Sequence, residues 1–309
     1  MKPLTKPPAL KPGDKIGIIA PASSFNRTGF EAGCERLRQM GYEPVYSENI
    51  FDRDLYFAGS TERRARELED MLQRRDIAAL ICARGGYGSN YLLERVDFQK
   101  FSDHPKILLG CSDITTLLTA ITDRTGLVTF HGPMVAKDIA TADGMDASSW
   151  KNALTGAESW SIATDGVEVL HPGKAKGRLY GGCLSLLVAS LGTEFEIQTD
   201  NTLLFLEDIG EKPYRIDRML MQLRMAGRLD AVCGIIFGEM PGCAASADQG
   251  YTLQQIIMRV LQDFNGPIVY GLKSGHVTSG NITLPIGVQA ELAADGSAVA
   301  LKILESATK

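Results

Sequence analysis

Residues 15 to 135 alternate short apolar runs with longer amphipathic segments, and this alternation restricts the fold more than any other feature of the chain. Apolar runs cover residues 15–22, 43–48, 77–83, 106–111 and 127–132, and helical patterns cover residues 30–41, 61–75 and 113–124. Strands of a parallel sheet are apolar along their length because helices cover both faces, and successive βαβ units produce this order of elements. The sequence therefore predicts a flavodoxin-like, doubly wound parallel sheet of about five strands.

The second half of the chain has a different pattern. Residues 136–175 are rich in small and polar residues, and after them helical patterns at 215–227 and 252–264 lie among apolar runs. The chain ends in two strand-like runs, 281–292 and 298–305, with no helix between them. A chain of 309 residues exceeds the usual size of a single core. We therefore expect an N-terminal α/β domain at 1–140, a linker region at 141–175 and a smaller mixed β/α domain at 176–309.

Composition excludes several classes of partner. The formal net charge is −5, and binding to a phosphate backbone needs clustered Lys and Arg. The first residues, MKPLTKPPALKPGD, contain no apolar segment long enough for a signal peptide or a membrane span. The six cysteines show no C-x-x-C spacing and several lie in apolar runs, as expected of core residues in a reducing compartment. We expect a cytoplasmic protein that binds neither nucleic acid nor membranes.

The segment GCSDITTLL, residues 110–118, joins an apolar run to a helical pattern, with Cys111, Ser112 and Asp113 at the junction. A hydroxyl at a strand-to-helix turn stands over the carboxyl edge of the sheet, where ligands bind in open α/β folds. Ser112 and Asp113 are also favoured helix caps, and the spacing differs from the G-x-S-x-G elbow. The segment alone leaves both a nucleophile and a cap open.

The segment ICARGGYGSNYLLERV, residues 81–96, predicts a strand, a glycine-rich turn and a helix. Glycines allow the backbone to approach an anion or a transition state closely. The spacing of Gly85, Gly86 and Gly88 is not a dinucleotide fingerprint, and no acidic residue follows at the required distance. A plain tight turn is the alternative.

Two polar residues of the second half complete a possible catalytic set. Glu207 ends the apolar run of TLLFLED, and His276 lies in a loop rich in Gly and Ser, whereas His131 ends another run without an assigned role. Each has an ordinary structural explanation by itself. Ser112, His276 and Glu207 together supply, in that order, a nucleophile, a base and a carboxylate that orients the base. The sequence thus predicts a site in an interdomain cleft.

Several blocks of sequence in order resemble the LD-carboxypeptidase family of serine peptidases, the muramoyltetrapeptide carboxypeptidases. The blocks are GDKIGIIAPAS (13–23), ARGGYG (83–88), GCSDIT (110–115), FHGPM (130–134), GRLYGGCLSLLVASLGT (177–193), FLEDIGEKPYRIDRML (205–220) and GHVTSGNITLPIG (275–287). The resemblance covers nearly the whole chain and implies the family's fold, a flavodoxin-like domain followed by a smaller mixed domain.

The resemblance also implies site residues and an activity. It assigns the nucleophile to Ser112, the acid to Glu207, the base to His276, and the oxyanion hole to the backbone amides of Asp113 and Gly86. The implied reaction releases terminal D-alanine from murein tetrapeptide during cytoplasmic recycling of the cell wall, without metal or cofactor. Homodimers are common in the family. We further expect a cation, Arg84, to bind the terminal carboxylate of the substrate; a structural ion pair is the alternative. The Asp113 side chain is expected at the helix start.

Two other functions remain open at this point. Self-immunity peptidases of the same family cleave peptide-nucleotide antibiotics and carry a longer loop with an aromatic residue that stacks on a base. The corresponding segment here, GEMPGCAASADQGY (238–251), is short and has only Tyr251 as an aromatic residue, which disfavours that function. The second alternative is a binding protein without catalytic activity.

Overall fold

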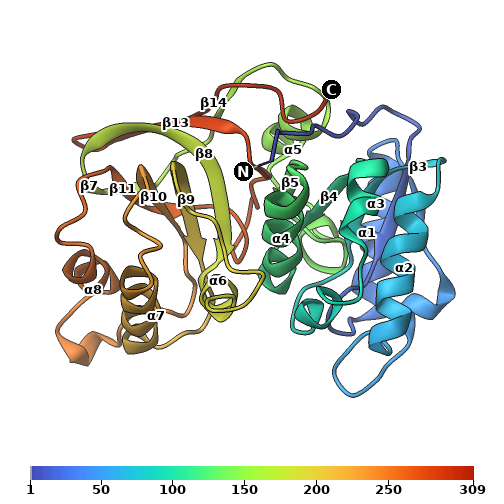
Figure 1. The fold of residues 1–309 in the computed structure, drawn as a ribbon, viewed down its shortest axis with the longest axis horizontal. Coiled ribbons are helices and arrows are strands. Elements are labelled where there is room, and N and C mark those ends of the chain that lie inside the picture. Colours follow the sequence, from blue (N-terminus) through green and yellow to red (C-terminus); the bar gives the residue numbers. More distant parts are fainter. Residues whose placement is uncertain (1) are drawn as a thin grey trace.

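The protein, a computed structural model that describes residues 2–309, has two α/β domains that lie side by side (Figure 1). One contains a six-stranded sheet and the other an eight-stranded sheet. The two-domain α/β organisation expected from the sequence is confirmed. No helix within residues 2–309 combines the length and the apolar character needed to cross a membrane.

The six-stranded sheet has the order β12-β5-β4-β3-β1-β2. Its strands are β1 (Lys15–Ile19), β2 (Glu43–Val45), β3 (Ile77–Cys82), β4 (Ile107–Gly110), β5 (Thr129–His131) and β12 (Leu284–Ile286). The five apolar runs of the first half each form one parallel strand. The sixth strand, β12, comes from near the end of the chain and pairs antiparallel with β5. One edge of the first sheet is therefore completed by the second half of the sequence.

Helices cover both faces of this sheet, as the continuous apolar strands require. One face packs against α1 (Arg27–Gln39), α5 (Ala147–Leu154) and a π-helical turn, η4 (Val135–Ile139). The other packs against α2 (Thr61–Gln73), α3 (Phe98–Asp103) and α4 (Thr115–Thr125). Asn26 caps α1 by accepting hydrogen bonds from two backbone N–H groups, and Ser60 caps α2. These side chains satisfy N–H groups that a helix start leaves without partners.

The prediction of a helix after the glycine-rich turn is wrong. Residues 89–96 contain only a short 3-10 turn, η2 (Ser89–Leu92). The N–H of Ser89 donates to the Asp113 carboxylate at 2.7 Å, and its hydroxyl donates to the Asp113 carbonyl at 2.6 Å. A new helix then begins early, because Asp97 accepts from the N–H of Gln99 and caps α3. The segment is anchored at both ends before a longer helix can form.

The eight-stranded sheet has the order β6-β14-β13-β8-β9-β10-β11-β7. Its strands are β6 (Trp160–Ile162), β7 (Glu168–His171), β8 (Gly173–Cys183), β9 (Thr202–Glu207), β10 (Gly234–Gly238), β11 (Ile268–Leu272), β13 (Gln289–Asp295) and β14 (Ala298–Ile303). The central strands β8 to β11 are parallel, and the outer strands are antiparallel to their neighbours. Helices α6 (Leu184–Ala189), α7 (Pro213–Met225) and α8 (Leu253–Val260) cover one face, at the lower left in Figure 1.

The other face of the eight-stranded sheet shares a hydrophobic core with the first domain. A single buried cluster contains Phe30 of α1 and Ile81 of β3 together with Phe205 of β9 and Leu292 of β13. Because apolar side chains from both sheets fill one interior, separating the domains exposes that interior to water. The shared core therefore fixes the position of one sheet relative to the other.

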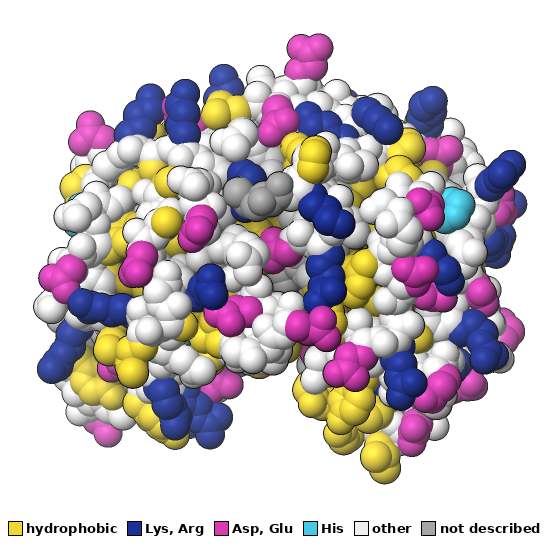
Figure 2. All heavy atoms as spheres, viewed as in Figure 1, with side chains coloured by type: hydrophobic (Ala, Val, Ile, Leu, Met, Phe, Trp, Pro, Cys, Tyr) yellow, Lys and Arg dark blue, Asp and Glu magenta, His cyan; other side chains and the backbone are white. Residues whose placement is uncertain are grey.

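The carboxyl ends of strands from both sheets meet at the domain boundary. Gly110 at the end of β4 pairs with His131 at the end of β5, and His131 lies against Glu207 at the end of β9. Thr115 at the start of α4 accepts a hydrogen bond from the N–H of Cys183, the last residue of β8, at 3.0 Å. The space-filling view in Figure 2 shows two lobes with a notch between them at the lower edge. The polar residues singled out in the sequence lie around this boundary.

Candidate active site

Ser112 lies two residues beyond the end of β4, in a short 3-10 turn, η3 (Ser112–Ile114), that leads into α4. Its φ angle is 60°, in the left-handed region that residues other than glycine seldom adopt. Such a conformation costs about 1–3 kcal/mol and persists where the surroundings enforce it. Neither η3 nor α4 has a side-chain cap, and within residues 2–309 the Ser112 hydroxyl makes no hydrogen bond. Ser112 is therefore not a helix cap.

Asp113 does not place its side chain at the helix start, contrary to expectation. Its carboxylate turns back and accepts from the N–H of Ser89 in the neighbouring turn. The side chain is completely buried. Burial raises the pKa of Asp113, and hydrogen bonds from Ser89 only partly oppose this effect. The side chain holds the glycine-rich turn next to η3 and leaves the cap position empty.

The glycine-rich turn packs directly against Ser112. A Cβ atom on Gly85 would lie 2.9 Å from the Cβ and 3.2 Å from the Oγ of Ser112, so any side chain at position 85 would collide with Ser112. The next residue, Gly86, has a φ angle of 100°. Among the residues that the structure describes, the Gly86 N–H donates no hydrogen bond. A free backbone donor therefore stands beside the Ser112 turn.

Glu207 and His276 form the most closely connected polar pair of the site. Glu207 Oε2 lies 2.7 Å from His276 Nδ1 and accepts from the His276 backbone N–H at 3.0 Å. The Glu207 side chain is completely buried, and that of His276 is 13% exposed. The backbone N–H and the Nδ1–H of His276 thus both donate to Glu207 Oε2. This leaves His276 Nε2 as the nitrogen available for proton transfer.

The electrostatics of this pair favour an ionised carboxylate. Burial by itself raises the pKa of Glu207. The polar contact with His131, the hydrogen bond from His276 and the positive charge of the imidazoles outweigh burial, and the pKa lies below its ordinary value. For His276, burial lowers the pKa, but the hydrogen bond and the charge of Glu207 outweigh burial and raise the pKa above 6.5. Each partner therefore stabilises the charged form of the other.

His131 and Ser274 join this pair, and the sequence did not assign a role to either of them. His131 Nε2 lies 3.6 Å from Glu207 Oε1, and His131 Nδ1 lies 3.0 Å from Ser274 Oγ. Both side chains are buried. The placement of His131 at a strand end, in FHGPM, was the available signal. Nothing in the local sequence distinguishes Ser274 from other loop serines.

The cysteine next to Ser112 differs from it in chemistry. Cys111 is completely buried, and burial raises the pKa of its thiol well above 9.0, with a further contribution from the charges of Asp138 and Glu207. Only a thiolate is a strong nucleophile. Cys111 is therefore protonated at neutral pH and acts as a small core residue at the end of β4.

Two cations lie near the site. Arg84, immediately before the glycine pair, is exposed, and its guanidinium donates to the Ser24 carbonyl at 2.9 Å. Lys137 on η4 is half exposed and lies 3.4 Å from Asp138 Oδ1. Its charge lowers the pKa of His276, an effect that needs proximity. The N–H of Ala136, the residue before Lys137, donates to the carbonyl of Ala83, next to Arg84, at 2.9 Å. Lys137 was not singled out from the sequence.

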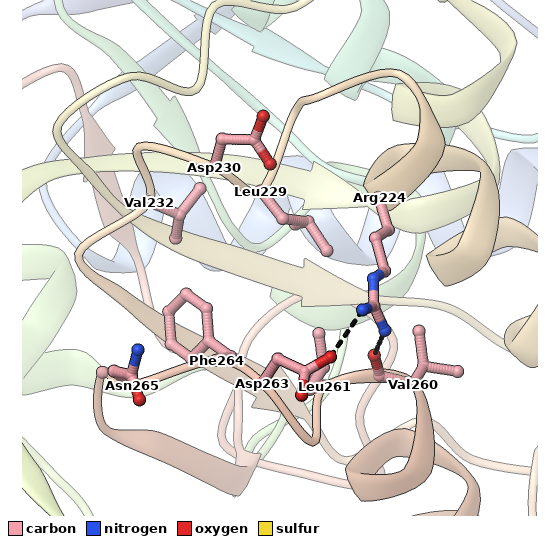
Figure 3. Close-up of a pocket in the computed structure, with 10 residues that line it drawn as sticks. Arg224, Leu229, Asp230, Val232, Val260, Leu261, Asp263, Phe264 and Asn265 are labelled. Atoms are coloured by element: carbon pink, nitrogen blue, oxygen red, sulfur yellow. Dashed lines mark hydrogen bonds and ion pairs between the residues drawn. The ribbon is translucent and has the colours of Figure 1, made fainter.

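A separate cavity of about 400 Å³ lies in the second domain, between the end of α7 and the segment after α8 (Figure 3). Arg224 and Asp263, which both line it, form an ion pair at 2.6 Å, and the Arg224 guanidinium also donates to the Val260 carbonyl. None of the site residues discussed above lines this cavity, so it does not contribute to the candidate site.

Sequence comparison places this arrangement in context. The profile of the LD-carboxypeptidase N-terminal domain matches residues 16–132, and that of the LD-carboxypeptidase C-terminal domain matches residues 176–292. The "Probable murein peptide carboxypeptidase" of Bacillus subtilis is 38% identical over 93% of this chain and 91% of its own length. The murein tetrapeptide carboxypeptidase of Pseudomonas aeruginosa is 31% identical over 85% of this chain and 88% of its own length.

Solved structures show the same fold. The muramoyltetrapeptide carboxypeptidase from Oxalobacter formigenes superposes with a TM-score of 0.85 at 29% identity, covering 94% of this chain and 99% of that one. The structure of MccF in complex with glutamyl sulfamoyl guanosine superposes with a TM-score of 0.91 at 24% identity, covering 98% of this chain and 99% of that one. At 24% identity the second likeness establishes the fold alone.

Proposed function

Because the chain belongs to the LD-carboxypeptidase family of serine peptidases, we propose that it releases the terminal D-alanine of murein tetrapeptide through Ser112, His276 and Glu207. The observation that carries this proposal is the buried Glu207 carboxylate, which accepts hydrogen bonds from the backbone N–H and from the Nδ1–H of His276. This arrangement keeps His276 in the tautomer with a free Nε2, which a general base requires.

The proposed reaction has two steps. His276 takes the proton of Ser112 Oγ, and the alkoxide attacks the carbonyl of the L,D-peptide bond to form a tetrahedral intermediate. His276 then gives the proton to the amine of D-alanine as the C–N bond breaks, which leaves an acyl-enzyme on Ser112. Water, deprotonated by His276, hydrolyses the ester and restores the serine. The Glu207 carboxylate stabilises the imidazolium in each step.

The oxyanion is assigned to the backbone amides of Asp113 and Gly86. Support comes from the contact of Gly85 with Ser112 and from the Gly86 N–H, which has no acceptor among the described residues. Fixed donors aimed at a developing oxyanion need no rearrangement during the reaction. Arg84 and Lys137 are the candidates for binding the free carboxylate of the terminal residue.

The experiment that tests the proposal compares two peptides. Murein tetrapeptide ending in D-alanine and the same peptide ending in L-alanine are incubated with the protein, and alanine release is measured by mass spectrometry. We expect release from the first peptide only. If neither peptide loses alanine, the carboxypeptidase function is wrong, and the Ser112→Ala variant serves as the blank for contaminating peptidases.

A peptidase that acts on a peptide-nucleotide antibiotic is the second candidate, since a microcin C7 self-immunity protein from Escherichia coli is 29% identical over 94% of this chain. The short segment 238–251 argues against it, because Tyr251 is its only aromatic residue. Adding a peptidyl nucleotide to the same assay separates the two functions, and cleavage of that compound alone would favour immunity. A binding protein without catalytic activity would leave all three compounds intact.

The proposed function includes a cellular setting and an assembly. Substrate of this kind arises in the cytoplasm when cell-wall fragments are recycled, so the cytoplasm is the proposed location. A homodimer is proposed on the family resemblance. Light scattering of the purified protein at micromolar concentration tests the assembly, and a mass near 33.5 kDa, that of one chain, would contradict it.

A further inference from the structure

The two oxygens of the Glu207 carboxylate have different partners. Oε2 accepts hydrogen bonds from the backbone N–H and the Nδ1–H of His276. Oε1 is buried and has no hydrogen-bond partner within residues 2–309, and the same is true of His131 Nε2. These two atoms lie 3.6 Å apart, and both side chains are completely buried. An unpaired buried carboxylate oxygen is costly, and His131 Nε2 is the group that faces it.

The proton on His131 follows from its other contact. Ser274 Oγ lies 3.0 Å from His131 Nδ1 and 2.8 Å from the Ile282 carbonyl. If Ser274 donates to Ile282, it accepts from Nδ1–H, and a neutral ring would turn the Nε2 lone pair toward a carboxylate, which is repulsive. The carboxylate therefore favours a ring that donates through both nitrogens. If Ser274 instead donates to Nδ1, the neutral ring carries its proton on Nε2. In both states Nε2–H faces Glu207.

We infer that His131 is a positioning residue, whose Nε2–H holds Oε1 of Glu207 so that Oε2 remains aligned with His276. His131 touches no reacting atom, and it acts through Glu207. This inference rests on the proposed function, since it concerns the same triad. Glu207 of the second domain thereby contacts a second histidine, which belongs to the first domain.

The position of His131 in the fold supports this role. His131 ends β5, pairs with Gly110 of β4 and with Leu284 of β12, and its ring packs edge-on against Phe205 with centroids 5.2 Å apart. Gly110 lies two residues before Ser112. His131 therefore ties the carboxylate of the second domain to the strand that carries the nucleophile. A ring held by strands on both sides and by an aromatic contact has little freedom to turn away.

The pKa of Glu207 agrees with this arrangement. The polar contact with His131 is foremost among the influences that lower it against the effect of burial. The other titratable or charged groups around Glu207 and His276 are Cys183 on β8, Asp208 after β9, Cys111 after β4 and Lys137 on η4. Without the His131 donor, the buried carboxylate is less stable as an anion. The Glu207–His276 pair then binds a proton more readily.

Two variants of similar polarity separate positioning from a structural role. In His131→Gln the amide nitrogen reaches the place of Nε2 and can still donate to Glu207. In His131→Asn the shorter side chain reaches only the place of Nδ1, near Ser274. Each variant is checked for folding by its melting temperature. If His131→Asn does not fold, Ser274→Ala replaces it, because this change removes the partner that fixes the His131 ring and leaves the ring in place.

The readout is the rate at which a fluorophosphonate probe labels Ser112, measured from pH 5 to pH 9 by mass spectrometry, with Ser112→Ala as the blank. Labelling requires an activated serine and does not depend on the natural substrate. We expect His131→Asn to slow labelling about 10- to 100-fold, the loss that one charge-assisted hydrogen bond supports, and to move the acid limb of the profile to higher pH. His131→Gln is expected within about threefold of wild type, with an unmoved limb.

Several outcomes overturn the inference. They are equal loss in the two variants, wild-type rates in both, slower labelling without a moved acid limb, and a wild-type protein that is not labelled at all. For Ser274→Ala, a smaller loss of labelling rate than in His131→Asn, with the same shift of the acid limb to higher pH, supports positioning. An unchanged pH profile contradicts it. Wild-type protein that is labelled but releases no D-alanine from tetrapeptide disproves the proposed substrate and leaves the test of His131 intact.

Discussion

At Ser112 the backbone itself is strained, and this strain distinguishes the residue from its neighbours. A serine at a φ angle of 60° is held by the tight contact with Gly85 and by the start of α4. In this conformation the Ser112 hydroxyl does not cap the helix start, which leaves it available for its proposed role as nucleophile.

A pair of substitutions separates the hydroxyl from the strain. Ser112→Ala removes the nucleophile and keeps the strained Cβ, whereas Ser112→Gly removes both, because glycine adopts positive φ without penalty. Both variants are expected to lose D-alanine release by at least about a thousandfold. Urea unfolding is expected to show Ser112→Gly as stable as Ser112→Ala or more stable by up to ~1 kcal/mol. A less stable glycine variant would mean that the strain is not present in solution.

The neighbouring thiol provides a matched control. Cys111→Ala is expected to keep substantial peptidase activity, because the buried Cys111 thiol has a raised pKa and supplies no thiolate at neutral pH. Activity is measured as D-alanine release under the conditions used for Ser112→Ala. Loss of activity in Cys111→Ala together with a tolerated Ser112→Ala would reverse the assignment of the nucleophile.

The pH dependence of activity follows from the raised pKa of His276. A general base must be neutral, so kcat/KM is low while His276 is protonated and increases as pH passes its pKa. Glu207 raises that pKa above 6.5, so half-maximal kcat/KM is expected above pH 6.5. In Glu207→Gln the charge is absent, and the acid limb is expected to move to lower pH with much lower activity. A wild-type limb below pH 6.5 would contradict this account.

The same groups determine how the pair affects stability. The raised pKa of His276 means that its contribution to folding is present at low pH and is lost as pH rises through that pKa. The lowered pKa of Glu207 means that its contribution is present above about pH 4.5 and is lost as pH falls below it. Both contributions are therefore present between about pH 4.5 and pH 6.5, and that of His276 declines at higher pH.

At the scale of single residues, the sequence identified partners that are far apart in the chain. Glu207 and His276, 69 positions apart, were chosen as strand-end and loop residues, and the structure places them in contact; their catalytic roles remain a prediction. The side-chain direction of Asp113 could not be predicted, because it depends on Ser89 in another loop. His131 lacked an assignment because its partner, Glu207, belongs to the other domain.

The loop between β11 and β12 carries His276, the proposed base, and its conformation depends on one glycine. Gly275, directly before His276, has a φ angle of 86°. A Cβ atom there would lie 2.6 Å from Glu207 Cδ and 2.8 Å from His131 Cε1. The backbone therefore passes against the carboxylate and the second imidazole at a point where no side chain fits. The loop is held by its contact with the buried pair.

Gly275→Ala and Gly280→Ala test this contact within one loop. Both glycines have positive φ, but an added Cβ at Gly280 would meet no atom within 4 Å. Strain at φ alone costs about 1–3 kcal/mol and is common to the two variants. We therefore expect both to lower the melting temperature and only Gly275→Ala to abolish D-alanine release. Equal activity in the two variants would show that Gly275 is not needed for close packing at the site.

At the scale of elements, the apolar runs of the first half predicted β1 to β5. The prediction is clearest for β1, β3, β4 and β5, which are largely buried, whereas the edge strand β2 has Glu43 exposed. The helix expected at residues 89–96 failed because hydrogen bonds from Ser89 to Asp113 anchor the segment, and such contacts are not visible in local sequence. The pairing of β12 with β5 was also beyond a local pattern. The run at 281–292 indicated a strand but not the sheet that receives it.

For the whole molecule, the shared core predicts a single unfolding transition. Residues of both sheets belong to one buried cluster, and β12 completes the first sheet from the second half of the chain. Neither domain can open without exposing the interior of the other. Circular dichroism of the helices and fluorescence of Trp150 and Trp160 are expected to report the same midpoint in urea. Two separate midpoints would show that the domains unfold independently.

The crossing of β12 into the first sheet also affects how the chain is made on the ribosome. β5 is synthesised about 150 residues before its neighbour β12, and at about 5–20 residues per second the delay is roughly 8 to 30 s. For most of that time Ser112 and strand β4 have been synthesised, one side of β5 has no partner strand, and the segment with His276 does not yet exist. A nascent chain therefore carries Ser112 without its proposed base until synthesis is nearly finished.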